Sequence, residues 1–268
     1  MKYEEGTFGY WWTVTKGNED IENEIYEGNI SCWYVELKSL KGCPKEVRGN
    51  FDCHTNKLTS LQYSPKIIKG NFDCSINKLS TLEYAPKVDK AFKCSANELT
   101  TLEGAPEKIK HDFICNENKL KNLQGSPKEV QGHFECAYNK LSSLKGSPEK
   151  IGLSFDCQNN ALKTLEGGPI SVGLDYTCSN NFLKNLVGLP EDRVELLNCQ
   201  NNVLQTLEGL PKEVSSANCN NNPNKHLNEE FNIRKENPNL SEPEILNKMF
   251  QITKDRNYLS KETNSLFM

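Results

Sequence analysis

Cysteine recurs along most of this chain at intervals of 20 or 21 residues, and this periodicity constrains the fold more than any other feature. A fixed period of this length is typical of solenoids, in which each repeat forms one turn and stacks on the next. The sequence therefore predicts a stack of about ten turns. Ten of the eleven cysteines belong to the column: Cys32, Cys53, Cys74, Cys94, Cys115, Cys136, Cys157, Cys178, Cys199 and Cys219.

Other residue types keep fixed positions relative to the cysteine. Asparagine follows three residues later in nine units, leucine follows five and eight residues later, and proline follows twelve residues later. The F-x-C alternation is that of a short strand with both side chains pointing inward. The asparagine is expected to bond backbone groups in the bend, and the proline favours an extended outer side. One unit contains Phe72, Cys74, Asn77, Leu79, Leu82 and Pro86.

The unit F-x-C-x-x-N-x-L-x-x-L-x-G-x-P resembles the leucine-rich repeat, whose core is L-x-x-L-x-L-x-x-N-x-L, over about 200 residues. Its second half resembles the short repeats of bacterial effector proteins, and similar units occur in proteins of large tailed phages. The resemblance implies an α/β leucine-rich-repeat solenoid with a horseshoe shape. A short-stranded parallel sheet is expected on the concave face, opposite an irregular or polyproline-like convex side.

We expect three regions along the chain. Residues 1–28 do not fit the repeat, and the apolar run 8–15 predicts a strand and hence a β-rich N-terminal cap. Residues 29–224 form the solenoid. Residues 225–268 form a helical C-terminal cap and tail, with helices expected at 225–237 and 242–257. Ser241 and Glu244 have the spacing of a capping box, and the apolar ending 266–268 either packs down or serves as a docking tail.

The charge balance bears on partners and location. The chain has 32 Lys and Arg against 36 Asp and Glu, a net charge of -4, which argues against binding to nucleic acid. No stretch reaches the roughly 18 consecutive apolar residues of a membrane-spanning helix. The acidic start differs from a secretory leader, which is basic and then apolar. We therefore expect a cytoplasmic protein that does not bind membranes.

The residue types that carry chemistry are arranged without a catalytic pattern. Neighbouring turns place successive cysteines about 4.8 Å apart with parallel Cβ vectors, which exceeds the roughly 3.8 Å Cβ separation of a disulfide. No C-x-x-C pair offers a zinc scaffold, so the cysteines are expected to be reduced core residues. We predict no catalytic residues, no cofactor and no metal, and therefore not an enzyme. The four histidines lie in different columns and different repeats: His54, His111, His133 and His226.

The concave strand face is the predicted binding surface. Three outward columns, taken three and one residues before each cysteine and one residue after it, carry six acids and one lysine. Lysines instead collect on the outside, as at Lys78, Lys119 and Lys140. We expect a protein partner with a basic surface, although these polar residues could simply keep the sheet soluble. The predicted site residues are Asp52, Asp73, Asp112, Glu135, Asp156, Asp175, Trp33, His54, His133 and Lys93.

The function expected from these features is protein binding without catalysis. The family resemblance implies a phage-encoded or bacterial effector protein that binds a host protein and inhibits or redirects it. A structural or self-assembling solenoid that oligomerises through its caps is an alternative, and a homo-oligomer stays open. A small-molecule binder, a nucleic-acid binder or an enzyme is a third class, which would need a convergent pocket of titratable groups that the sequence does not show.

Overall fold

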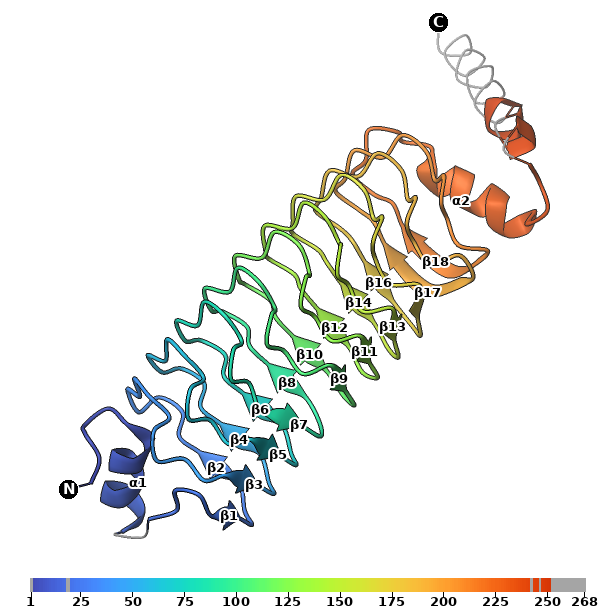
Figure 1. The fold of residues 1–268 in the computed structure, drawn as a ribbon. Coiled ribbons are helices and arrows are strands. Elements are labelled where there is room, and N and C mark those ends of the chain that lie inside the picture. Colours follow the sequence, from blue (N-terminus) through green and yellow to red (C-terminus); the bar gives the residue numbers. More distant parts are fainter. Residues whose placement is uncertain (1, 18–19, 242, 246, 252–268) are drawn as a thin grey trace, which may run out of the picture.

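The structure is a computed structural model that describes residues 2–17, 20–241, 243–245 and 247–251. It is a parallel β-solenoid whose turns stack along a nearly straight axis in the view of Figure 1. One ten-stranded parallel sheet runs the length of the stack, with each new strand added at the same edge. Its strands are β2 (Ile30–Ser31), β4 (Phe51–Asp52), β6 (Phe72–Asp73), β8 (Phe92–Lys93), β10 (Phe113–Ile114), β12 (Phe134–Glu135), β14 (Phe155–Asp156), β16 (Tyr176–Thr177), β17 (Arg193–Asn198) and β18 (Glu213–Asn218).

The core consists of columns of identical or similar apolar side chains. The strands pair in register, so Phe113 lies between Phe92 and Phe134. From Phe51 to Tyr176, successive ring centroids are 5.0 to 6.0 Å apart, within the range of favourable aromatic contacts. The cysteine column and the two leucine columns are buried beside these rings. The predicted inward direction of the phenylalanine and cysteine side chains is confirmed.

Part of the outer side is also a sheet, which corrects the prediction of an irregular or polyproline-like convex side. The Val or Ile that follows each proline points inward, and its extended backbone pairs with the neighbouring turn. The segment between the two leucines contains neither helix nor strand in the described units. The outer strands form two four-stranded sheets. They are β1 (Ile25–Tyr26), β3 (Glu46–Val47), β5 (Ile67–Ile68) and β7 (Lys87–Val88), then β9 (Lys108–Ile109), β11 (Glu129–Val130), β13 (Lys150–Ile151) and β15 (Ser171–Val172).

Repeat length explains where these outer sheets end. The break between β7 and β9 falls in a 20-residue unit, in which only Lys87 separates Pro86 from Val88. In most turns, three residues separate the inward Val or Ile from the next residue of the Phe column. In the last two turns only two residues do, as between Val194 and Leu197. The corner between the two sheets is then lost, and β17 and β18 each run continuously for six residues.

The asparagine column joins each turn to the one before it. Asn118 Nδ2 donates to the carbonyl oxygens of Cys115, Asn116 and Cys94, each at 3.1 Å. Its Oδ1 accepts the N–H of Leu99 at 3.0 Å. The same four contacts recur at every asparagine of the column, which confirms its predicted role: Asn56, Asn77, Asn97, Asn118, Asn139, Asn160, Asn181, Asn202 and Asn222.

At the N-terminal end the predicted strand over 8–15 is wrong, because these residues form the helix α1 (Phe8–Lys16). Thr7 caps the helix, since its Oγ1 accepts the N–H of Tyr10 at 3.3 Å. The apolar residues satisfy a helical spacing as well as an alternating one. Phe8 and Trp12, one helical turn apart, are buried, and Phe8 contacts Phe51 of the core. Val14, which alternation would bury with them, is 60% exposed.

At the other end lies the helix α2 (Leu227–Glu236), where a helix over 225–237 was predicted (Figure 1). Glu230 is buried and its Oε1 accepts the N–H of Leu207 at 3.1 Å. Residues 243–245 and 247–251 are helical, and Ser241 N–H donates to Glu244 Oε2 at 2.8 Å, as expected for the capping box. The predicted continuation of this helix to 257 and the ending Leu266-Phe267-Met268 lie outside the described residues.

Candidate binding surface

The outward face of the ten-stranded sheet, here called the sheet face, carries most of the predicted site residues. A strand points alternate side chains to opposite faces, so the residue before each buried cysteine points outward. Neighbouring strands lie about 4.8 Å apart, so the face from β4 to β16 is roughly 29 Å long. The half-buried residues that end these strands include Asp52, Asp73, Lys93, Glu135 and Asp156.

Strand register sorts these carboxylates into two neighbouring pairs. Asp52 on β4 lies directly beside Asp73 on β6, and Glu135 on β12 lies beside Asp156 on β14. Lys93 is the next residue of the column beyond Asp73. Within the described part of the chain, no Lys or Arg nitrogen lies within 4.0 Å of any of these four carboxylates. Like charges at this spacing repel each other. Because no Lys or Arg neutralises them at close range, these carboxylates give the face a negative field.

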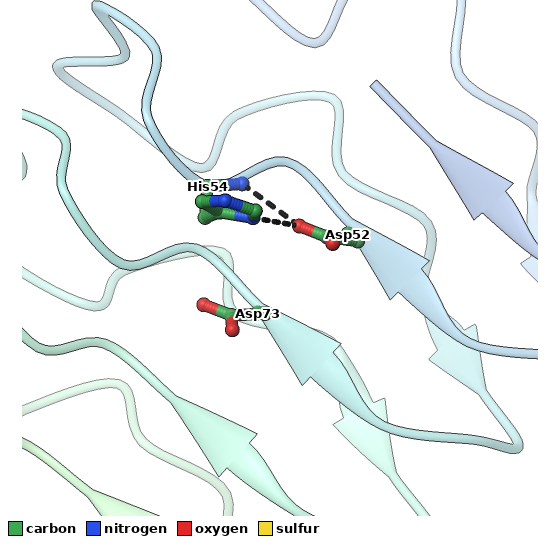
Figure 2. A group of neighbouring side chains, drawn as sticks. All are labelled: Asp52, His54 and Asp73. Atoms are coloured by element: carbon green, nitrogen blue, oxygen red, sulfur yellow. Dashed lines mark hydrogen bonds and ion pairs between the residues drawn. The ribbon is translucent and has the colours of Figure 1, made fainter. Parts of the chain in front are cut away.

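The first pair includes a histidine (Figure 2). His54 follows Asp52 by two residues, and its Nδ1 lies 2.6 Å from Asp52 Oδ1. The backbone N–H of His54 donates to the same oxygen at 3.1 Å. The indole of Trp33, from the preceding turn, stacks on the imidazole with ring centroids 5.5 Å apart and planes 5° apart. Asp73 lies on the next strand with Oδ1 accepting the N–H of Ser75 at 3.0 Å.

The second pair has neutral amide partners instead. Asn116 Nδ2 donates to Glu135 Oε2 at 2.8 Å. Gln158 donates to Asp156 through both its backbone N–H and its Nε2, each at 2.9 Å. Burial raises the pKa of the Asp156 carboxyl above its ordinary value. Both pairs are therefore held in place by local hydrogen bonds, but only the first includes an imidazole.

The remaining predicted residues lie where the strands begin. Asp112 precedes β10, and its Oδ1 accepts the N–H of His133, which precedes β12, at 2.9 Å. Asn29 and Asn50 make the same contact to the next turn at 2.7 and 2.8 Å. Asp175 precedes β16 and is half-buried. Sequence reasoning missed this second hydrogen-bonded column, although Asn or Asp at the position three residues before cysteine was a visible signal.

The outer lysines are compensated more fully than the sheet-face carboxylates. Lys119 Nζ lies 2.9 Å from Glu98 Oε2, and Lys57 pairs with Glu36. These pairs link neighbouring turns on an exposed surface, where each contributes little stability. The outer side therefore presents mixed charge, while the sheet face presents carboxylates with few cationic neighbours.

A groove at the C-terminal end was not predicted. It has a volume of about 850 Å³ and lies between β18 and α2. Leu210, Val214 and Phe231 line it together with the cations Lys212 and Lys235. Lys235 donates to the carbonyl oxygen of Ser215 at 2.8 Å, so one of these cations is already bound to the strand beside it. The sequence pattern decays in this region, and the packing of α2 could not be inferred from it.

Comparison of the chain with protein-family models, with curated proteins and with solved structures finds no match. The residues that the structure describes contain no helix with the length and apolar character needed to cross a bilayer.

Proposed function

We propose that this protein is a non-catalytic binding module whose sheet face holds a protein partner with a basic surface. The observation that carries the proposal is the register of the sheet, which gathers carboxylates from turns far apart in sequence onto one surface. A negative field of this kind attracts Lys and Arg side chains and speeds their association. The same field disfavours the phosphate backbone of a nucleic acid.

The family and setting belong to the same proposal. The repeat motif supports kinship with leucine-rich-repeat proteins, although the outer strands after the proline depart from the irregular outer side that this kinship suggests. The likeness of the unit to repeats of bacterial effectors and tailed phages supports a cytoplasmic role in which the protein occupies a host factor. A repeat surface of this length suits such a role because it offers many weak contacts along one partner.

The test is affinity capture from lysate of the native host with three forms of the protein, each verified as folded by circular dichroism. The first is the wild type, the second carries Asp73→Lys, Glu135→Lys and Asp156→Lys, and the third carries Lys78→Glu, Lys119→Glu and Lys140→Glu. We expect basic proteins to be retained by the wild type and the third form and lost from the second. Their binding to the wild type should also weaken as salt rises.

Loss of the partner only from the form altered on the outer side would place the binding surface there and contradict the proposal. Equal retention by all three forms would also contradict it, and would point to the groove beside α2 or to the half-buried aromatic residues Tyr10 and Trp11 of α1. The triple reversal on the outer side is the matched control because it changes the same number of charges, two of them in the same repeats as the sheet-face substitutions.

A further inference from the structure

We propose that Asp52, His54 and Asp73 form a binding site for one divalent first-row transition ion, with Zn²⁺ as its typical occupant. One donor atom from each of the three side chains lies within 4.8 Å of the donor atoms of the other two (Figure 2). This inference concerns a different class of ligand from the proposed protein partner, and it uses one of the two carboxylate pairs of the sheet face.

The donor set suits such an ion. Zn²⁺ takes imidazole nitrogen at 2.0–2.1 Å and carboxylate oxygen at 2.0–2.2 Å, which places tetrahedral donors roughly 3.4 Å apart. His54 Nδ1 and Asp52 Oδ1 already lie closer than this, at 2.6 Å. The third donor comes from Asp73 on the neighbouring strand, held beside Asp52 by the register of β4 and β6. The carboxylates of Asp52 and Asp73 are half-exposed, which leaves them room to turn toward the imidazole, and water would complete the coordination.

The imidazole distinguishes this site from a simple pair of acids. Glu135 and Asp156 stand in the same relation on β12 and β14, but the residue after the cysteine in those turns is Ala137 or Gln158. An amide cannot replace imidazole as a ligand for Zn²⁺, since nitrogen and sulfur donors provide the selectivity for this ion. The chain therefore contains its own control, a carboxylate pair in the same geometry without the histidine.

Trp33 holds the histidine ring from a second direction. Its indole stacks on the imidazole and comes from a different turn, so the orientation of His54 does not depend on the two carboxylates alone. A ligand whose ring is fixed before the ion arrives loses less conformational freedom on binding. The indole also places a fluorophore against the ligand, which gives the site a spectroscopic signal of its own.

The experiment is calorimetric titration of the full chain with ZnCl₂ in a thiol-free reductant. The wild type is compared with His54→Gln, with Asp73→Asn and with the control Glu135→Gln plus Asp156→Asn. Gln at position 54 can keep the hydrogen bond to Asp52, because Gln158 makes that bond to Asp156. We expect one ion per chain in the wild type and in the control. The two site variants should bind at least about tenfold more weakly.

Quenching of Trp33 emission by Ni²⁺ provides a second measurement, and Trp33→Phe should abolish the quenching while Zn²⁺ still binds. Three results would overturn the proposal: no saturable binding to the wild type up to about 1 mM Zn²⁺, equal affinity in His54→Gln and the wild type, or an equal loss in the Glu135→Gln plus Asp156→Asn control. The second result would exclude the imidazole as a ligand, and the third would reduce the effect to a diffuse acidic field.

Discussion

At the residue scale, stability depends on asparagines that satisfy four backbone groups each. The bend after the strand leaves three carbonyl oxygens and one N–H within hydrogen-bond distance of the asparagine side chain. The carboxamide oxygen accepts the N–H, and its two N–H donors serve the three carbonyls, so one hydrogen is shared between two of them. The residue just before the asparagine adopts a left-handed conformation, as Tyr138 does with φ of 55°. Six asparagines of the column are buried, so water cannot easily replace these bonds.

The first residue-scale prediction concerns Asn139. Asn139→Ala should lower the free energy of unfolding by about 1–3 kcal/mol, because it leaves buried or half-buried backbone groups without partners. Asn139→Asp should destabilise as well, because it keeps the acceptor but replaces the donor nitrogen with a charged oxygen facing three carbonyls. Urea unfolding measures both changes. Lys140→Ala, at the exposed neighbour, is the control, and equal shifts for all three variants would contradict the structural role of the asparagine.

At the element scale, the number of residues between two inward positions decides whether the chain turns a corner. Three residues between the inward Val or Ile and the next Phe give two strands on two sheets, as from Val130 to Phe134. Two residues give one continuous strand, as in β17. A residue missing between the proline and the Val has a different effect. Only Lys87 lies between Pro86 and Val88, and β7 and β9 do not pair. Asp89 and Gln131 donate their N–H groups to the preceding turn on either side of this break.

The second prediction follows from this break. A glutamate inserted between Lys87 and Val88 would restore the Pro-Lys-Glu-Val spacing seen at Pro127–Val130. We expect β7 and β9 to pair, the amide of Lys110 to become protected from hydrogen exchange, and stability to rise by about 0.5–1.5 kcal/mol for each bond gained. The same insertion between Glu129 and Val130 is the control and should destabilise. No added protection at Lys110 would show that the break has another cause.

Elements were predictable where the repeat recurs and unpredictable where it does not. The buried Phe, Cys and Leu columns and the asparagine contacts follow from periodicity, because every turn repeats the same solution. The run 8–15 occurs once, and its aromatic residues fit both a strand and a helix, so only packing on Phe51 decides. On the sheet face, spacing predicts which residues point outward. Whether His54 contacts Asp52 depends on its side-chain rotamer, which spacing does not define.

At the scale of the whole molecule, ten of the eleven cysteines form a single buried column, and Cys43 is buried beside it. All eleven are free thiols, and seven of them donate Sγ–H to a carbonyl oxygen of the next turn at 3.2 to 3.5 Å. Burial raises the pKa of nine thiols above the ordinary value of 9.0. At the last pair, a hydrogen bond between the two sulfurs raises the pKa of Cys199 and lowers that of Cys219.

The third prediction is a steep loss of stability in alkali. Below about pH 9 the thiols are protonated in both states, so they do not change the unfolding free energy. Above that pH the unfolded chain releases protons that the folded chain retains, and each thiol removes about 1.4 kcal/mol per pH unit. The summed loss of unfolding free energy from nine such thiols exceeds the stability of a typical domain, about 5–15 kcal/mol, within one to two pH units above pH 9. Circular dichroism between pH 7 and 11, with a reductant present, measures the transition.

The dependence of the unfolding free energy on pH gives the number of protons released on unfolding. This number should fall by one for each thiol removed, as in Cys115→Ala and Cys136→Ala. A slope that does not change with the number of thiols would assign the transition to lysine or tyrosine instead. The midpoint is not the test, because the cavity left by each alanine shifts it independently.

The asparagine contacts also set the order in which the turns can be completed during synthesis. Each asparagine bonds backward, to a carbonyl 24 residues earlier and an N–H 19 residues earlier in most turns, so a turn is completed only by residues of the turn that follows. A chain leaving the ribosome would therefore close each turn about one repeat late. At every stage of synthesis the last turn at the growing end would be incomplete, because the backbone carbonyl and N–H that bind the next asparagine would still lack that partner.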